Sequence, residues 1–295
     1  MAEPRRRDLV PAFGSEITGV DLRAELDDDT VAFLREVFDE RGLLLFRDLE
    51  IDREVQFTLT QVLRGHDVPT PEERRAGAAA QGSFYISNKR ERSVAPFGRL
   101  LFHADGMWTD EPFEVLSLHA EHVEPPVPST SFASATGAWA TLPDDLRARV
   151  VGADAVQVGG PEDFHEARRR RYGDDVMQTV REDAPSFAMP IARPHPRTGA
   201  TILNASENHT KEIVGLSEAE SDELLEQLFA HLYRPENTYE HEWRTGDLVI
   251  WDNEALQHAR PNVTVEGSTR TLAKMGLPVP TSAAAVQVKS FDLAK

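Results

Sequence analysis

The stretch GDLVIWDNEALQHARPN, residues 246–262, joins a buried strand to a histidine through a tight turn. The apolar run Leu248–Trp251 predicts a strand that is buried on both faces, and the Gly-Asp pair before it predicts a chain reversal. The Asp-Asn pair after it predicts a second turn, which His258 follows. A histidine in this position is a candidate metal ligand if the chain supplies further ligands.

A second stretch, LLFHADGMW (residues 100–108), supplies two such ligands at the end of another apolar run. Residues two apart in a strand point to the same face, so His103 and Asp105 can present an imidazole nitrogen and a carboxylate oxygen to one ion. A bare His-x-Asp pattern is common by chance, and two ligands do not make a specific site. With His258 the set becomes two histidines and one carboxylate, which is the facial triad of non-haem iron(II) oxygenases.

The segment TRTLAKMGL, residues 269–277, carries two cations on one strand face. By the same alternation Arg270, Leu272 and Lys274 point the same way. A guanidinium inside a barrel needs an anionic partner, and a dicarboxylate co-substrate would supply one for Arg270. Lys274 has two interpretations that remain open: contact with an anionic group of the primary substrate, or extension to the rim of the barrel.

Composition excludes several classes of function. The 295 residues contain 32 Lys and Arg against 50 Asp and Glu, a net charge of −18, and no cysteine. Such an excess of negative charge disfavours nucleic acid and anionic membranes as partners. Without cysteine there is no disulfide, no thiolate metal site and no cysteine nucleophile, so a metal must use His, Asp or Glu. No apolar run is long enough for a signal peptide or a membrane span, and we expect a cytoplasmic protein.

The chain predicts a mainly β fold with flanking helices, built around a double-stranded β-helix (jelly-roll) core. Helical periodicity covers residues 27–42, 51–65, 137–150 and 215–234, the last with a capping box at Ser217 and Glu220. Residues 67–83, rich in Pro, Gly and Ala, predict a mobile connection. Strands are expected in residues 43–47, 83–88, 98–103, 113–120, 130–135, 187–192, 247–252 and 270–277.

Most of the chain resembles the taurine dioxygenase-like (TauD/TfdA) family of Fe(II)/2-oxoglutarate-dependent oxygenases. The segments that carry the resemblance are GSEITGVDLRAEL, RGLLLFRDLEID, FHADGMW, EHVEPPVPSTSFAS, RPHPRTGATILN and WRTGDLVIWDNEALQHARP. The resemblance implies that His103, Asp105 and His258 bind the iron and that Arg270 holds the distal carboxylate of 2-oxoglutarate. It also assigns a hydroxyl contact with 2-oxoglutarate to Thr130, although Val-Pro-Ser stands before Thr130 where the family has Gly-Gly-Asp.

The implied activity is oxidation, most simply hydroxylation, of an unactivated C–H bond in a small anionic substrate, with release of succinate and CO2. Fe(II), 2-oxoglutarate and O2 would be the cofactors and co-substrates. Halogenating relatives lack the carboxylate of Asp105, so its presence favours oxygenation. Desaturation, cyclisation or oxidative cleavage of a biosynthetic intermediate uses the same cofactors. Two rivals from other classes are a non-catalytic barrel that binds metal or 2-oxoglutarate and a metal-dependent isomerase or hydrolase.

The resemblance also implies one dioxygenase domain over residues 1–295, with lid or insertion segments around 66–82 and 160–185, and a homo-oligomer is compatible with it. We expect substrate contacts from residues near the iron segments: Tyr85, Ser87, Asn88, Trp108 and Lys274.

The remaining polar clusters predict structural roles. The basic run Arg168–Arg171 predicts a solvated helix face, with an arginine that meets a substrate carboxylate as the alternative. His119 and His122 are expected to face opposite sides of a strand, and His195 to lie in a turn. For His209 we expect a solvated loop histidine, with an approach to the substrate as the alternative.

Overall fold

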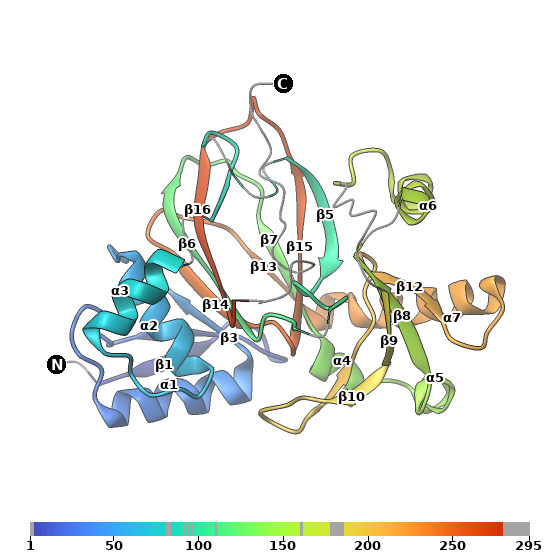
Figure 1. The fold of residues 1–295 in the computed structure, drawn as a ribbon, viewed down its shortest axis with the longest axis horizontal. Coiled ribbons are helices and arrows are strands. Elements are labelled where there is room, and N and C mark those ends of the chain that lie inside the picture. The colour runs from blue at the N-terminus through green and yellow to red at the C-terminus, as the bar shows by residue number, and fades with distance from the viewer. Residues whose placement is uncertain are drawn as a thin grey trace.

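The computed structural model describes residues 3–80, 84–90, 93, 95, 97–109, 111–159, 162–177 and 186–279. Its centre is a pair of sheets that lie opposite each other (Figure 1). The seven-stranded sheet has the order β1-β2-β3-β14-β6-β16-β4 and the four-stranded sheet has the order β13-β7-β15-β5. Their strands are β1 Arg5–Asp8, β2 Ser15–Thr18, β3 Leu43–Phe46, β4 Tyr85–Ser87, β5 Gly98–His103, β6 Val115–Val123, β7 Thr130–Ser134, β13 Thr238–His241, β14 Leu248–Asp252, β15 Leu256–Val263 and β16 Arg270–Leu277.

The space between these sheets is filled by large apolar side chains from both. Phe132 of β7 lies edge-on to Trp251 of β14, with 5.3 Å between ring centroids, and both are fully buried. Leu118 of β6 and Leu272 of β16 belong to the same cluster. Two opposed sheets with side chains of both packed between them form the jelly-roll core. The predicted mainly β architecture is therefore confirmed.

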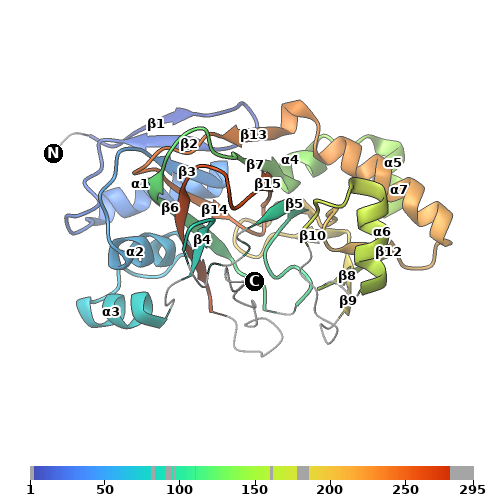
Figure 2. The same ribbon diagram turned by 90° about the horizontal axis from the view of Figure 1, so that it is seen from above.

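Helices α1 Asp28–Arg41, α2 Arg53–Leu63 and α3 Pro71–Ala80 lie on the outer side of the seven-stranded sheet (Figures 1 and 2). The Asp27 side chain caps α1 by accepting a hydrogen bond from the backbone N–H of Thr30, and Gly42 ends it at φ 68°. Leu34 and Phe38, on the predicted apolar face of α1, are fully buried against the outer face of β3 and β14. One face of this sheet therefore packs on helices, and the other faces the barrel interior.

A second group of elements lies on the other side of the barrel, toward the right of Figure 1. It consists of α4 Ala135–Ala140, α5 Asp144–Val150, α6 Glu162–Tyr172, α7 Glu218–Leu232, the 3-10 turn η1 Pro235–Asn237, and strands β8 Asp154–Val158, β9 Ser186–Pro190, β10 Ala192–Pro194, β11 Thr201–Leu203 and β12 Thr210–Ile213. The capping box predicted for α7 is present, with Ser217 and Glu220 bonded reciprocally. Leu224 and Leu228 of α7 are buried in the cluster that joins these elements.

Two predicted elements differ from the structure. The single helix expected in residues 137–150 is two helices, because Pro143 adopts an extended conformation at the start of α5 and disfavours helical geometry in the residue before it. Residues 67–83 were predicted as a mobile connection, which is wrong for Pro71–Ala80, the helix α3. Its start is fixed by Thr70, whose N–H and hydroxyl both donate to the Glu73 carboxylate at 2.8 Å. The alanines that follow are strong helix formers.

Among the described residues, no helix combines the length and the apolar character that a membrane span requires.

Asp247, at the turn into β14, joins the two sheets by an ion pair and backbone bonds. Its carboxylate accepts hydrogen bonds from Arg47 Nη1 at 2.6 Å and from the backbone N–H of Arg244 at 2.9 Å, and His241 Nε2 lies 3.2 Å away. Burial alone would raise the pKa of Asp247, but these donors outweigh it and the pKa lies below its ordinary value. A carboxylate with a depressed pKa in the folded state stabilises the fold above its unfolded pKa and loses that contribution as the pH falls.

We therefore expect Asp247→Asn to lower the free energy of unfolding by about 3 kcal/mol at pH 7. The difference between the variant and the wild type should shrink below about pH 4, where the unfolded carboxyl also binds a proton. Urea unfolding at pH 7, 5 and 3 measures both quantities. A difference that stays constant over this range would contradict the assigned role.

Candidate active site

His103 is the last residue of β5 and points into the barrel with one ring nitrogen already occupied. Its side chain is 6% exposed, and Nδ1 lies 2.8 Å from the carbonyl oxygen of Leu101. Since a carbonyl only accepts, Nδ1 is the donor in this hydrogen bond, and Nε2 is the nitrogen that remains for a metal ion. Nε2 faces the carboxylate of Asp105 at 3.3 Å.

Asp105 follows the end of β5 and is held in place through its backbone by Asn253. The Asp105 N–H donates to Asn253 Oδ1 at 2.9 Å, and Asn253 Nδ2 donates to the Asp105 carbonyl at 2.9 Å and to the Phe113 carbonyl at 2.8 Å. Asn253 is 1% exposed. The turn after β14 therefore fixes the conformation of the loop that carries Asp105, a role that the sequence did not reveal.

His258 comes from β15, which pairs with β5 so that His258 lies opposite His103. The two ring centroids are 4.2 Å apart, and the ring of Trp251 lies 4.9 Å from His258 on the other side. Burial lowers the pKa of His258 well below its ordinary value, so the imidazole is neutral, as a metal ligand must be. Its Nδ1 is buried with no hydrogen-bond partner among the described residues.

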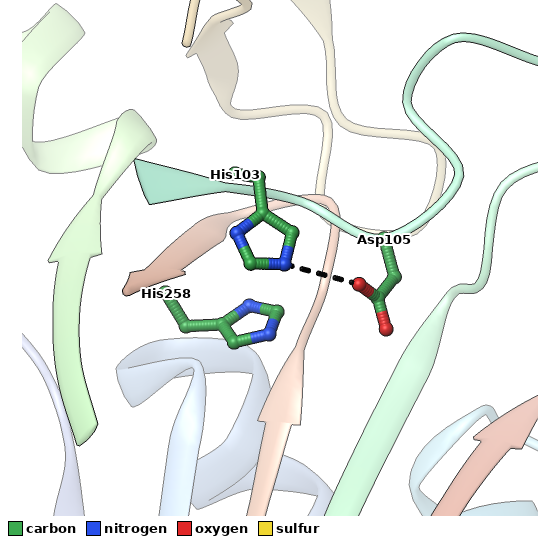
Figure 3. A group of neighbouring side chains, drawn as sticks. All are labelled: His103, Asp105 and His258. Atoms are coloured by element: carbon green, nitrogen blue, oxygen red, sulfur yellow. Dashed lines mark ion pairs between the residues drawn. The ribbon is translucent and has the colours of Figure 1, made fainter. Parts of the chain in front are cut away.

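These three side chains could hold one metal ion, because each offers a ligand atom and all these atoms lie within 4.8 Å of one another. Figure 3 shows the two imidazoles one above the other, with the Asp105 carboxylate beside them beyond the end of the strand that bears His103. Two imidazoles and a carboxylate without any thiolate suit non-haem Fe(II).

Lys274 forms an ion pair with Asp105. Burial alone would raise the pKa of Asp105, but the Lys274 ammonium and the hydrogen bond with His103 outweigh it and hold the pKa well below its usual range. The carboxylate is therefore ionised and ready to bind a cation. Lys274 thus lies at the metal-ligand group.

Arg270 opens β16 and lies 2% exposed in the same interior. Its Nη2 donates to Thr130 Oγ1 at 3.1 Å, and Trp243 Nε1 donates to the same oxygen at 2.9 Å. The Nε of Arg270 has no partner in the described part of the chain. Burial, followed by the charge of Arg260, lowers the pKa of Arg270 to about 9, so it remains charged at neutral pH.

Of the predicted substrate contacts on β4, two turn away from the barrel interior. Tyr85 lies opposite Ala273 and Ser87 opposite Thr271 in the β4–β16 register, so both share the face opposite to that of Lys274. The Tyr85 hydroxyl donates to Glu121 at 3.1 Å, and Ser87 Oγ lies 2.9 Å from Thr271 Oγ1.

Asn88 and Trp108, the two other predicted contacts, have different surroundings. The Asn88 amide donates to three carbonyls of the turn before β16, and its Oδ1 accepts from the Arg270 N–H at 3.0 Å. Its polar atoms are thereby used to shape that turn. The Trp108 ring lies 4.3 Å from the ring of His209, and its Nε1 is buried without a partner among the described residues.

His209 and Arg168 were predicted to be solvated, and both predictions are wrong. His209 is 1% exposed and lies edge-on to His103 at 5.9 Å between ring centroids. Its Nδ1 donates to the Val158 carbonyl at 2.9 Å, and its Nε2 accepts from Asn208 Nδ2 at 3.0 Å. Arg168 of α6 is 4% exposed and donates to Asn208 Oδ1. These contacts come from elements far apart in the chain, so local polarity could not reveal them.

The other histidines agree with their predicted structural roles. The facing predicted for His119 and His122, however, is wrong. The β6–β16 register shifts between them, so they lie opposite Ala273 and Thr271, which share one face of the sheet. His195 stands at a turn, where its Nδ1 accepts the backbone N–H groups of Arg197 and Thr198 at 3.1 Å.

A jelly roll with two histidines, a carboxylate and a buried arginine in its interior defines the class of non-haem iron oxygenases. The chain belongs to the taurine catabolism dioxygenase TauD, TfdA family, whose family model matches residues 5–275. It is a 2-oxoglutarate-dependent non-haem iron dioxygenase, and Fe(II), 2-oxoglutarate and O2 are its cofactors and co-substrates.

Individual relatives agree with this assignment. The (S)-phenoxypropionate/alpha-ketoglutarate-dioxygenase of Sphingobium herbicidovorans is 29% identical over 85% of this chain and 88% of its own length. Pentalenolactone F synthase of Streptomyces arenae is 30% identical over 68% of this chain and 77% of its own length. The crystal structure of a taurine dioxygenase from Burkholderia xenovorans matches with a TM-score of 0.70 and 25% identity, over 93% of this chain and 90% of that one.

Removal of the Asn253 side chain should loosen the loop that carries Asp105. We expect Asn253→Ala to weaken Fe(II) binding by roughly 10- to 100-fold, the usual effect of losing a group that orients a metal ligand. Titration of the apoprotein with Fe(II) under anaerobic conditions measures this. Asn237→Ala is the matched control, since Asn237 is equally buried and its amide also donates to two backbone carbonyls, at 2.8 and 2.7 Å. Equal affinities for the two variants would refute the role of Asn253.

Proposed function

We propose that His103, Asp105 and His258 bind the Fe(II) of this dioxygenase and that Arg270 and Thr130 bind the far carboxylate of 2-oxoglutarate. The proposal rests on the metal-ligand atoms and the buried arginine that lie together in the interior of the barrel. Three candidate ligands lie within 4.8 Å, and in the same interior a buried guanidinium has no carboxylate partner among the described residues. Buried charges are stable only when they are paired. A divalent cation and a dicarboxylate would pair both.

Bound Fe(II), together with 2-oxoglutarate and O2, supplies the oxidation of an unactivated C–H bond, with succinate and CO2 as co-products. The residues of this chain bind and orient the metal ion and the substrates, and they exclude water from the site. Asn253 holds the loop of Asp105. The Trp251 ring packs against His258, and an apolar wall of this kind keeps solvent from the metal group.

The primary substrate in this proposal is a small anion that is hydroxylated. Lys274 supports it, because this ammonium lies at the metal-ligand group and a bound cation on Asp105 would compete for the same carboxylate and release the ammonium for a substrate. The name of the Sphingobium relative also points to a carboxylate substrate. Trp108, whose indole N–H has no hydrogen-bond partner among the described residues, is the second proposed substrate contact. Tyr85, Ser87 and Asn88 have other partners and are left out.

Desaturation, cyclisation or cleavage of a biosynthetic intermediate is the second candidate, because pentalenolactone F synthase is among the relatives. We further propose a single cytoplasmic dioxygenase domain, with lid or insertion segments around residues 66–82 and 160–185, of which residues 81–82, 160–161 and 178–185 lie outside the described part of the chain. The family match over residues 5–275 and the absence of cysteine support these points. A homo-oligomer stays a prediction.

Anaerobic reconstitution with Fe(II) and 2-oxoglutarate, followed by O2 and a panel of small carboxylates and sulfonates, tests the activity. We expect succinate to form in step with one substrate. Asp105→Ala should abolish this turnover, because the variant lacks the carboxylate of the two-histidine, one-carboxylate set that non-haem Fe(II) oxygenases use. Full turnover by the variant would refute the ligand assignment, and binding of 2-oxoglutarate without succinate under every condition would indicate a non-catalytic barrel.

Arg270→Gln should raise the KM for 2-oxoglutarate by roughly 100-fold, the usual effect of truncating one partner of a buried charge pair. Initial rates of succinate formation against 2-oxoglutarate concentration measure it. The KM for the primary substrate serves as the internal control and should change little. An unchanged KM for 2-oxoglutarate would exclude Arg270 from its binding.

A further inference from the structure

A second buried arginine, Arg260, lies on the strand that carries His258. It is 5% exposed, and its Nη2 donates to the carbonyls of Phe97 at 3.0 Å and Gly98 at 3.2 Å. Its Nε and Nη1 are buried and have no partner among the described residues. The hydrogen bonds to the two carbonyls thus use one nitrogen of the Arg260 guanidinium, and they do not explain why the other two nitrogens are buried.

The strand register puts Arg260 beside Thr130. In the β15–β7 pairing His258 lies opposite Phe132 and Ala259 opposite Ser131, so Arg260 and Thr130 are the next positions along the ladder. Residues opposite each other in an antiparallel pair point to the same face. Arg260 therefore shares its face with Thr130, the residue whose hydroxyl accepts from Arg270.

The polar atoms that converge here are all donors. Thr130 Oγ1 already accepts from Arg270 Nη2 and from Trp243 Nε1, so both of its electron pairs are used and its hydrogen remains to be donated. Arg270 Nε and two nitrogens of Arg260 also have no hydrogen-bond partner within the described part of the chain. Within the described chain no carboxylate forms an ion pair with either arginine. A group of buried donors without an acceptor is built for an anion.

Another buried arginine of this protein shows what a purely structural role looks like. Arg41 is 9% exposed and donates to the carbonyls of Val10 at 2.6 Å and Pro11 at 3.2 Å, much as Arg260 donates to Phe97 and Gly98. Arg41, however, also has the carboxylate of Asp8 at 3.6 Å. Arg260 has the same backbone bonds without the compensating charge.

We propose that Arg260 is a second cationic contact for the far carboxylate of 2-oxoglutarate. This carboxylate then lies between Arg260 and Arg270 and accepts a hydrogen bond from the Thr130 hydroxyl. The proposal rests on the proposed function of Arg270 and Thr130 and adds a specificity-determining residue to it. A pocket with two guanidiniums binds a 2-oxo acid that carries a terminal carboxylate far better than one that ends in a methyl group.

The test compares two ligands that differ only in this carboxylate, 2-oxoglutarate and 2-oxobutyrate. Isothermal titration calorimetry of the Mn(II)-loaded protein without O2 measures both affinities in the absence of turnover. Arg260→Gln should weaken the binding of 2-oxoglutarate by about 30-fold or more and change that of 2-oxobutyrate by less than about threefold. Arg260→Lys, which keeps the charge and loses the fork, should give a smaller loss with the same selectivity.

Two further variants separate the outcomes. Arg41→Gln is the matched control and should leave both affinities unchanged, while Arg270→Gln should weaken only the binding of 2-oxoglutarate. If Arg270→Gln behaves so but Arg260→Gln weakens both ligands equally or neither, Arg260 only holds Phe97 and Gly98, and this inference is overturned while the proposed function stands. If Arg270→Gln fails to discriminate, the assignment of the far carboxylate fails and this inference fails with it. Should Arg260→Gln not fold, the selectivity of Arg260→Lys decides.

Discussion

The pairing of β15 with both β5 and β7 is the constraint on which the whole site depends. One strand sets His258 opposite His103 on one side and opposite Phe132 on the other. A shift of one residue in this register would turn every side chain of β15 to the opposite face. It would separate the two imidazoles and remove Arg260 from the interior in the same step. The two histidines of the metal-ligand group and Arg260 are therefore positioned by one set of strand pairings.

The third ligand lies outside that ladder and is fixed by a different means. Asp105 follows the end of β5, where strand pairing no longer controls the backbone, and Asn253 replaces the missing ladder bonds with one accepted and one donated hydrogen bond. Asn253 itself follows β14, the strand whose Trp251 packs on His258. The same segment thus contacts two of the three candidate ligands.

The sequence predicted those parts that follow from local pattern. Apolar runs located β14 and β16, and alternation correctly put Arg270, Leu272 and Lys274 on one face. It did not predict β15, because LQHARPNV has no apolar alternation: several of its inward positions are occupied by site residues. The sequence also did not predict which side chains of β4 point into the barrel. Ile86 packs toward the core, whereas Tyr85 and Ser87 point outward. That choice is set by the register with β16, which only the folded chain determines.

The charge distribution explains how an acidic protein attracts an anionic co-substrate. The net charge is −18, yet three cations, Arg260, Arg270 and Lys274, lie in the barrel interior, and among the described residues only Lys274 of these three forms an ion pair, with Asp105. At physiological ionic strength the Debye length is about 8 Å, so exposed acids act weakly beyond their immediate neighbourhood. Buried guanidiniums are screened far less, and their field dominates once a ligand enters. A small dicarboxylate can reach that field, whereas a polyanion stays outside with the repelling surface. The same arrangement links stability to binding, because an anion that satisfies the interior donors binds the folded state alone and stabilises it.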